Sequence, residues 1–526
     1  MRWSILLAAA ALFPARALAC GGMFCDAIAP VDQSAERIIF SFDGAYLDTE
    51  VQISYSGQDD DFAWVVPVPA EPELFESNDA IFTQLANATI PSFTLLSDYT
   101  GGPIGCGGME DAGMSADSAM AAPMEDGSAG VSVVSTETVG PYDTVVLQAT
   151  DGDVLVQWLQ DQGYTLPDTL GAALDPYVAA GQYFVALKLS SDKDVGDLAP
   201  LRMRYAATAA SIPIQLTAVA AVPDLPIEVF LLGPSRAVPD NYLHVELNEA
   251  AIDWYNGGTN YRDAVAKAVD EAGGQAFVTD YVGPAAVTTV WSQGMVDPQY
   301  LLSLTDPIQW LESIVYSGLP GSSQLNALLV RYVPAPPGVD NATFLSCPSC
   351  YSGQVSAPDF DPVVATAALQ EEVLTVMQEQ QERLDAATTL TRMFTTMDAS
   401  EMTADPFFVF NSDLPQEVAL QHVATDHLHE SLTGNVTSRS LELADGRTFR
   451  FADPDVPSLA GVDTPAALVI SDLSASGEGT PVFDGTGDAE AAASAFGGGC
   501  TTTDSAGAFA PLLVLVAGVA RRRKVS

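Results

Sequence analysis

Three of the four histidines in this chain are clustered near residue 425. The cluster holds His422, His427 and His429, with Asp426 among them. On a helix, His422, Asp426 and His429 would share one face, whereas on a strand His427 and His429 would share a face instead. The spacing matches no known hydrolase motif, which favours polar surface histidines. The alternative hypothesis is a divalent metal site built from these four residues, because imidazole and carboxylate groups suit zinc or copper.

Cysteine is the second residue type with its own chemistry, and the chain has six. Only two residues separate Cys347 from Cys350 in a proline-rich stretch, which predicts a local structural disulfide. A redox motif and half of a metal site are the alternative interpretations. The further disulfide candidates are Cys20, Cys25 and Cys106. If Cys500 is set aside, the count is odd, so either one thiol is free, or Cys20 carries lipid, or Cys500 is a partner.

The first nineteen residues have the pattern of a cleaved secretory signal. A basic Arg2 precedes an apolar stretch, and residues 17–19 read Ala-Leu-Ala directly before Cys20. This small-x-small pattern predicts cleavage after Ala19 and export of the protein. Lipidation of Cys20 is a competing interpretation, although Ala17 stands where an apolar residue is usual.

The C-terminal segment, residues 500–526, has the order of a sorting or anchoring signal. Its apolar run, residues 506–520, is shorter than the roughly 20 residues of a membrane-spanning helix. The run contains Pro511 and is followed by a basic cluster at 521–524 that would stay cytoplasmic. The segment resembles the Myxo-type sorting signal of some bacterial surface proteins, which implies that Cys500 is processed and lipid-linked. An ordinary C-terminal membrane anchor is the alternative, and both interpretations place the chain at the cell envelope.

The composition limits what the exported part can do. The chain has 526 residues, 48% of them hydrophobic, which predicts two or three globular domains. Its formal net charge is -48, so phosphate repulsion opposes nucleic-acid binding. A solvated acidic surface suited to salty surroundings explains this charge, with weak binding of divalent cations as the alternative. The sequence indicates no particular protein or ligand partner.

Hydrophobic patterning predicts the elements that must position these residues. Alternating apolar residues on both sides of Asp43-Gly44 indicate a β-hairpin, and the section 20–335 reads as a β-rich α+β domain with short packed helices. Its expected helices are 78–87, 153–162 and 261–272, and its expected strands include 183–189, 201–205, 214–222 and 227–232. Residues 101–130 lack apolar periodicity, which predicts a flexible insertion.

A helical and mixed section is expected after this domain. Residues 336–360 form a connector rich in proline and cysteine. Residues 361–476 hold a long helix candidate at 362 to about 397, with a break near Asp385 as the alternative, followed by strands. Asp445-Gly446 is expected to be a hairpin turn. Small residues at 477–499 predict a linker to the C-terminal signal.

Four short motifs occur in an order that is similar to the bacterial domain of unknown function 2330 family. The similarity extends from residue 20 to about residue 333, interrupted by the insertion. It implies an exported protein and a shared fold, and it carries over no catalytic residues. The motifs are Cys20-Gly21-Gly22-Met23-Phe24-Cys25, Phe62-Ala63-Trp64-Val65-Val66-Pro67-Val68-Pro69, Trp158-Leu159 with Gly163-Tyr164, and Leu198-Ala199-Pro200-Leu201.

Two functional hypotheses follow from the sequence. The first is a non-catalytic envelope protein that acts in binding or in surface architecture, since neither a Gly-x-Ser-x-Gly elbow nor a phosphate-cradling loop is present. The second is a metal-binding protein or metal-dependent enzyme that uses the histidine cluster. No cofactor other than a divalent metal is suggested.

Overall fold

A computed structural model describes residues 23–24, 36–52, 63–100, 131–164, 170–190, 198–219, 221–430, 436–451 and 464–487. Several predicted features lie outside these residues. They are the signal peptide with Ala19, Cys20, Cys25, the insertion 101–130 with Cys106, and the C-terminal signal with Cys500 and the apolar run 506–520. Within the described part of the chain, no helix is both long and apolar enough to cross a membrane.

The largest sheet has ten strands in the order β22-β21-β14-β15-β16-β12-β2-β3-β10-β5. The predicted hairpin is present as β2 and β3, and Gly44 in its turn has a φ of 63°, which glycine adopts readily. The strands are β2 (Glu36–Asp43), β3 (Tyr46–Gln52), β5 (Glu73–Glu76), β10 (Leu201–Ala206), β12 (Leu225–Gly233), β14 (Leu243–Leu247), β15 (Ala276–Pro284), β16 (Thr389–Met397), β21 (Ala467–Asp472) and β22 (Thr480–Asp484).

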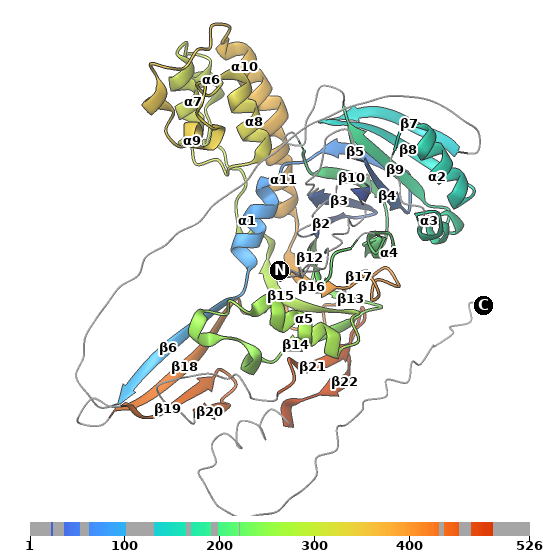
Figure 1. Ribbon diagram of the computed structural model, residues 1–526, viewed down its shortest axis with the longest axis vertical. Coiled ribbons are helices and arrows are strands. Elements are labelled where there is room, and N and C mark those ends of the chain that lie inside the picture. The colour runs from blue at the N-terminus through green and yellow to red at the C-terminus, as the bar shows by residue number, and fades with distance from the viewer. Residues whose placement is uncertain are drawn as a thin grey trace, which may run out of the picture.

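A five-stranded sheet packs against one end of the large sheet, and one hydrophobic cluster includes side chains from both. Two helices, α2 (Gly152–Asp161) and α3 (Leu170–Ala179), cover its outer face (Figure 1). Asp151 caps α2 by accepting hydrogen bonds from two backbone N–H groups. Trp158 lies on the inner face of α2 and is part of the hydrophobic core, as predicted. The strands are β1 (Met23–Phe24), β4 (Ala63–Val68), β7 (Val131–Val139), β8 (Tyr142–Ala149) and β9 (Tyr183–Leu189).

Two smaller sheets complete the β structure. A four-stranded sheet, in the order β20-β19-β18-β6, extends from the body as a blade (Figure 1). Its strands are β6 (Ser92–Thr100), β18 (Gln421–Glu430), β19 (Val436–Leu443) and β20 (Thr448–Arg450). The other sheet joins β11 (Ala210–Ser211), β13 (Ala237–Pro239) and β17 (Phe407–Phe410), near α4 (Ile214–Thr217). The helix α5 (Tyr261–Glu271) packs on the large sheet. Together with the 3₁₀ helices η3 (Glu249–Ala251) and η4 (Trp254–Asn256), it also shares a hydrophobic cluster with β18, β19 and β20 of the blade.

Most of the helices form a lobe at one end of the molecule, inserted between the adjacent strands β15 and β16 (Figure 1). Asp306 and Asp361 cap two of its helices, and each is followed by a proline at the first helical position. The elements between these strands are η5 (Ala285–Val287), α6 (Pro298–Leu301), α7 (Pro307–Val315), α8 (Ser323–Tyr332), α9 (Asn341–Ser346), η6 (Pro348–Tyr351), α10 (Pro362–Ala368), the π-helix η7 (Leu369–Leu374) and α11 (Thr375–Ala386). Helix α1 (Ala80–Thr89) contacts α11.

The α+β class is confirmed, with a β-rich first part and a helical, mixed section after it. Two element predictions are wrong. The single helix expected over 362 to about 397 ends at Ala386, next to the alternative break near Asp385. Residues 389–397 form β16, whose threonines favour a strand and whose nine residues are all buried. The strand expected at 214–222 begins instead as α4, which follows directly after Pro213.

Strands of the later section, residues 361–476, pair directly with strands of the first section, residues 20–335. Strand β16 lies between β12 and β15, and β21 pairs with β14. The predicted connector 336–360 contains α9 and η6, and residues 480–484 of the predicted linker form β22. Strands β16 and β21 of the later section, and β22 of the predicted linker, therefore belong to the same large sheet as β2 and β3.

Candidate functional site

The four predicted metal ligands all lie on β18, in the blade, where they alternate between its two faces. Ala424, Asp426 and Leu428 are buried on the inner face, so His422 also belongs to that face. His427 and His429 lie on the outer face, as expected for a strand. The four side chains therefore do not converge on one point.

Each inner-face ligand candidate already has a partner. Nδ1 of His422 lies 2.7 Å from Oε1 of Glu249, and its ring stacks on Phe93 with 5.0 Å between centroids. Asp426 is buried and accepts hydrogen bonds from Nε of Arg439 at 2.9 Å and from the hydroxyl of Tyr255 at 3.1 Å. These contacts join β18 to its neighbour β19 within the blade, and they join the blade to η3 and η4.

His427 bridges three strands on the outer face. Its Nδ1 lies 3.1 Å from Oδ2 of Asp98 on β6, and its Nε2 lies 2.7 Å from Oε2 of Glu442 on β19. The hydrogen bond to Glu442, followed by that to Asp98, raises the pKa of His427 above its ordinary value. Both ring nitrogens thus donate when the ring is protonated. Within the described residues, no group of three or more histidine, cysteine, aspartate or glutamate side chains is arranged to hold a metal ion.

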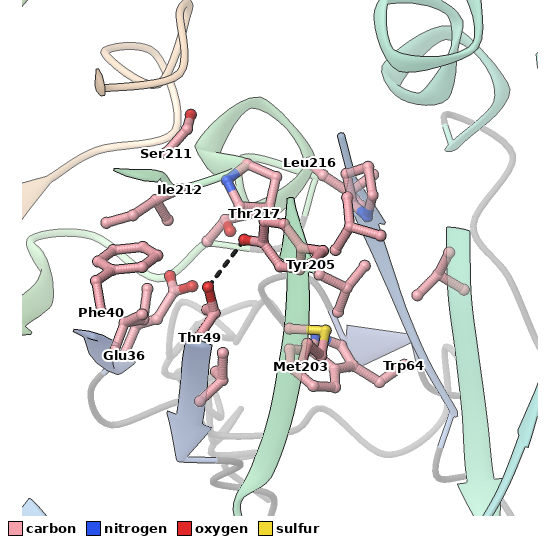
Figure 2. Close-up of a pocket in the computed structure, with 17 residues that line it drawn as sticks. Glu36, Phe40, Thr49, Trp64, Met203, Tyr205, Ser211, Ile212, Leu216 and Thr217 are labelled. Carbon is pink, nitrogen blue, oxygen red and sulfur yellow. Dashed lines mark hydrogen bonds between the residues drawn. The ribbon is translucent and has the colours of Figure 1, made fainter. Parts of the chain in front are cut away.

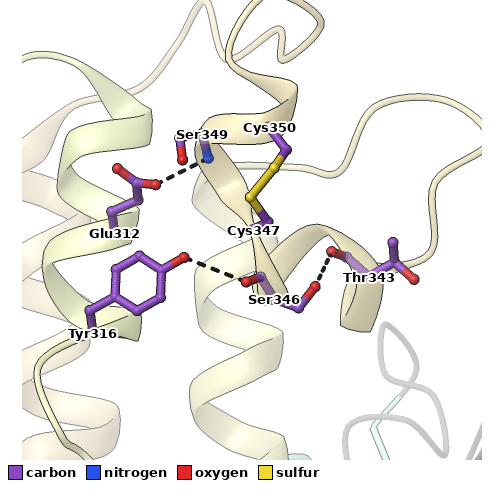
Figure 3. The surroundings of a disulfide bond; sticks show 7 residues. All are labelled: Glu312, Tyr316, Thr343, Ser346, Cys347, Ser349 and Cys350. Atoms are coloured by element: carbon purple, nitrogen blue, oxygen red, sulfur yellow. Dashed lines mark hydrogen bonds between the residues drawn. A yellow bond between two sulfur atoms is a disulfide. The ribbon is translucent and has the colours of Figure 1, made fainter.

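Of the cysteines, Cys347 and Cys350 are described, and they form a disulfide in the helical lobe (Figure 3). The bond closes the short η6 turn that follows α9. Next to it, the Ser349 N–H donates to Oε1 of Glu312 at 3.1 Å, which ties the turn to α7. The disulfide and this hydrogen bond together hold the turn against α7, as expected for a structural disulfide.

A small cavity lies between the large sheet and the five-stranded sheet (Figure 2), and it has about 40 Å³ of space. Its wall is formed mainly by apolar side chains from β2, β3, β4, β10 and α4. These are Ile38, Phe40, Val51, Trp64, Val65, Val66, Pro67, Val68, Met203, Ile212, Pro213 and Leu216. Its polar lining residues are Glu36, Thr49, Tyr205, Ser211 and Thr217.

Glu36 differs from the other polar groups of the wall. The hydroxyls of Thr49 and Tyr205 are hydrogen-bonded to each other at 2.8 Å, so they satisfy one another. The Glu36 residue is intermediate in exposure, yet its Oε2 atom is buried and has no hydrogen-bond partner among the described residues. Burial raises the pKa of Glu36 to about 7, although a hydrogen bond with Thr217 acts in the opposite direction. The carboxyl group can therefore gain or lose its proton near neutral pH.

Sequence reasoning missed this cavity, although one signal was available. Glu36, Ile38 and Phe40 occupy alternate positions of β2 and line the same cavity. The glutamate therefore shares a face of the strand with two large apolar residues, and that face is buried. The remaining wall residues extend to Thr217, so only the folded chain brings them together.

Comparisons with known proteins locate this cavity in the part of the chain that a family model matches. A family model described as "Uncharacterized protein conserved in bacteria (DUF2330)" matches residues 14–290, a little over half of the 526 residues. No curated protein and no solved structure matches the chain. Every lining residue of the cavity falls inside the matched range, whereas β18 with its histidines falls outside it. On this match, the chain belongs to the bacterial domain of unknown function 2330 family, as the four motifs predicted.

Proposed function

We propose that this chain is an exported protein that is held at the cell envelope by its C-terminal segment and binds a small ligand in the Glu36 cavity. Export is supported by the signal pattern of residues 1–19, and anchoring by the order of Cys500, apolar run and basic cluster. Binding is supported by the cavity. The protein would act outside the cytoplasmic membrane by holding a ligand there.

The single observation that carries the binding proposal is the buried Oε2 atom of Glu36, which lacks a partner among the described residues. A buried polar atom left without a hydrogen bond costs about 1–3 kcal/mol. Apolar cavities with a few converging polar groups are typical ligand sites, and those that hold drug-sized ligands have about 300–1,000 Å³. A ligand of this cavity of about 40 Å³ must therefore be very small. A ligand that both fills the cavity and contacts Glu36 would offset this cost.

Xenon tests whether the cavity accepts a guest, because xenon enters apolar cavities without regard to charge. We expect methyl NMR signals of Ile38, Val66 and Met203 to shift under xenon pressure. The variant Val66→Ile adds one methyl group to the wall and should reduce the shifts. Val229→Ile is the matched control, since Val229 is buried in the same hydrophobic cluster but does not line the cavity. Unshifted methyl signals would overturn the binding proposal.

The location is tested separately by cell fractionation. We expect Cys500→Ala to release the protein from the envelope fraction, while Ser505→Ala, a substitution in the same segment, leaves it there. Envelope retention of Cys500→Ala equal to that of the unchanged protein would contradict the processing of Cys500.

A further inference from the structure

We infer that the Glu36 cavity binds a short primary alkylammonium ion, with its ammonium group against the Glu36 carboxylate and its alkyl chain against the apolar wall. This inference rests on the proposed function, because it names the ligand class of the same cavity. The cavity wall sets two requirements for the ligand. One end of the ligand must carry a positive charge that donates hydrogen bonds, and the rest of the ligand must be apolar.

The first requirement comes from the charge balance around Glu36. Among the described residues that line the cavity, none is a lysine, arginine or histidine. Arg37, the next residue along β2, is bonded to Glu228 at 3.1 Å instead. An ionised Glu36 is therefore a buried carboxylate without a cation, which is strongly unfavourable. An ammonium group supplies both the missing charge and donors for the Oε2 atom.

The second requirement comes from the rest of the wall. The side chains of Ile38, Val66 and Met203 offer only apolar contact, and Phe40 and Trp64 present aromatic rings that favour a nearby cation. Thr49 and Tyr205 are bonded to each other and need no ligand. Thr217 is hydrogen-bonded to Glu36, which leaves Ser211 as the remaining polar lining residue. A ligand with several further polar groups would therefore lose hydrogen bonds on entering, and the wall favours an alkyl end without a second charge.

The size of the cavity limits the length of the chain. Because about 10–15 Å³ of such space is enough to hold one water molecule, a cavity of about 40 Å³ has room for a ligand the size of a few water molecules. Methylammonium and ethylammonium fit this limit, whereas butylammonium exceeds it. Affinity should therefore rise from methyl to ethyl and fall again with longer chains.

The charge of the whole molecule favours the same class of ligand. With 68 acidic and 20 basic residues, the protein attracts cations and repels anions. A small carboxylic acid would meet this repulsion and would bring a second acidic group to Glu36. The remaining competitor is a neutral hydrogen-bond acceptor, such as an alcohol, that accepts the proton of an un-ionised Glu36.

The dependence of affinity on pH separates these two ligands. An alkylammonium keeps its proton in this range, as the lysine side chain does with a pKa of about 10.4. Its partner must be the ionised Glu36, and the pKa of this group is about 7. The ionised fraction, and with it the affinity for ethylammonium, should rise about tenfold from pH 6 to pH 8. Affinity for ethanol as a neutral acceptor should fall over the same range.

Titrations of the exported chain with ethylammonium chloride and with ethanol, followed by methyl NMR, test the inference. We expect ethylammonium to bind more tightly than ethanol at pH 8, and Glu36→Gln to lose at least tenfold in affinity for it. Glu73→Gln is the matched control, since Glu73 is an exposed glutamate of the same sheet and should leave affinity unchanged. Equal losses in the two variants would overturn the inference in favour of general attraction to an acidic surface.

The outcomes also distinguish this inference from the proposed function. If ethanol binds more tightly than ethylammonium and binds best at pH 6, the ammonium inference is wrong but the cavity remains a ligand site. If xenon shifts the cavity methyl signals while neither probe binds, the ligand class is wrong and the cavity is still accessible. If xenon produces no shift, the proposed function itself is overturned.

Discussion

At the scale of single residues, Glu36 sets a pH dependence of stability. Its pKa is raised from 4.5 to about 7 by burial, so folding favours the protonated carboxyl group. The stabilising effect is complete below pH 4.5 and is lost as pH rises through the folded-state pKa. We expect Glu36→Gln, which stays neutral, to gain up to about 3 kcal/mol over the unchanged protein between pH 4.5 and pH 8. Urea unfolding across this range measures the difference, and a gap that does not widen with pH would contradict it.

His427 depends on pH in the same direction for another reason. Its hydrogen bonds to Glu442 and Asp98 raise its pKa, so its stabilising contribution is present below the ordinary histidine pKa and is lost as pH rises through the folded value. The side chains are partly exposed, so the coupling should be about 0.2–1 kcal/mol. A double-mutant cycle of His427→Gln and Glu442→Gln measures it. Coupling should be present at pH 5 and weak at pH 9, and equal coupling at both would contradict the account.

The histidine cluster could be recognised from the sequence, whereas the burial of Glu36 could not. The histidine cluster is visible because its members are close along the chain, but strand alternation sends His422 and His427 to opposite faces. Glu36 is one of many acidic residues, and its burial depends on α4 and β10, which lie far along the chain. A buried carboxyl group made by distant elements leaves no local pattern beyond its alternation with Ile38 and Phe40.

At the scale of elements, a buried ion pair joins α11 to the large sheet. Nη2 of Arg383 on α11 donates to Oε1 of Glu50 on β3 at 2.9 Å, and Glu50 is fully buried. Although burial would raise the pKa of Glu50, Arg383 and hydrogen bonds from Ser77 and Gln380 hold it below its ordinary value. The pair therefore stabilises the fold at neutral pH, and its contribution is lost as pH falls through the lowered pKa.

Removing one member of this pair should lower the stability of the fold. We expect Arg383→Met to reduce the free energy of unfolding by about 3–5 kcal/mol, because it leaves the Glu50 carboxylate buried without its cation. Arg331→Met is the matched control, since Arg331 and Glu372 form an exposed pair in the same lobe that should contribute at most about 1 kcal/mol. Urea unfolding measures both variants. Equal losses would mean that burial of Glu50 has little energetic effect.

Elements with a strong local pattern were predictable. The hairpin around Gly44, the helix α2 with its buried Trp158 and the turn at Gly446 follow from alternation, helical spacing and turn residues. Strand β16 was missed because it directly follows a long helix and all nine of its residues are buried, so no alternation of buried and exposed residues marks it. Its pairing with β12 and β15 on either side agrees with the strand preference of its threonines.

At the scale of the whole molecule, the net charge of -48 sets the response to salt. Like charges at the surface repel one another in the compact state, and salt screens that repulsion. We expect the melting temperature to rise by several degrees as sodium chloride increases from low to near-molar concentration. The rise should shrink near pH 4, where many carboxylates are protonated. Calorimetry measures both series, and a melting temperature that falls with salt would contradict the account.

The overall topology was beyond sequence reasoning for a related reason. The chain leaves the large sheet after β15, builds the helical lobe and then returns with β16 to pair beside β15. Patterning identifies strands and helices one by one, but it does not show which distant strands become neighbours. The α+β class could therefore be predicted, whereas the wall of the Glu36 cavity could not.

The most direct test of the central claim is an NMR titration of the Glu36 side-chain carboxyl carbon, with and without ethylammonium. We expect a pKa of about 7 in the free protein, because the carboxyl group is buried without a cation. Saturating ethylammonium should lower that pKa, since the ligand stabilises the ionised form. A free-protein value near 4.5, or a raised value that ethylammonium leaves unchanged, would contradict the account.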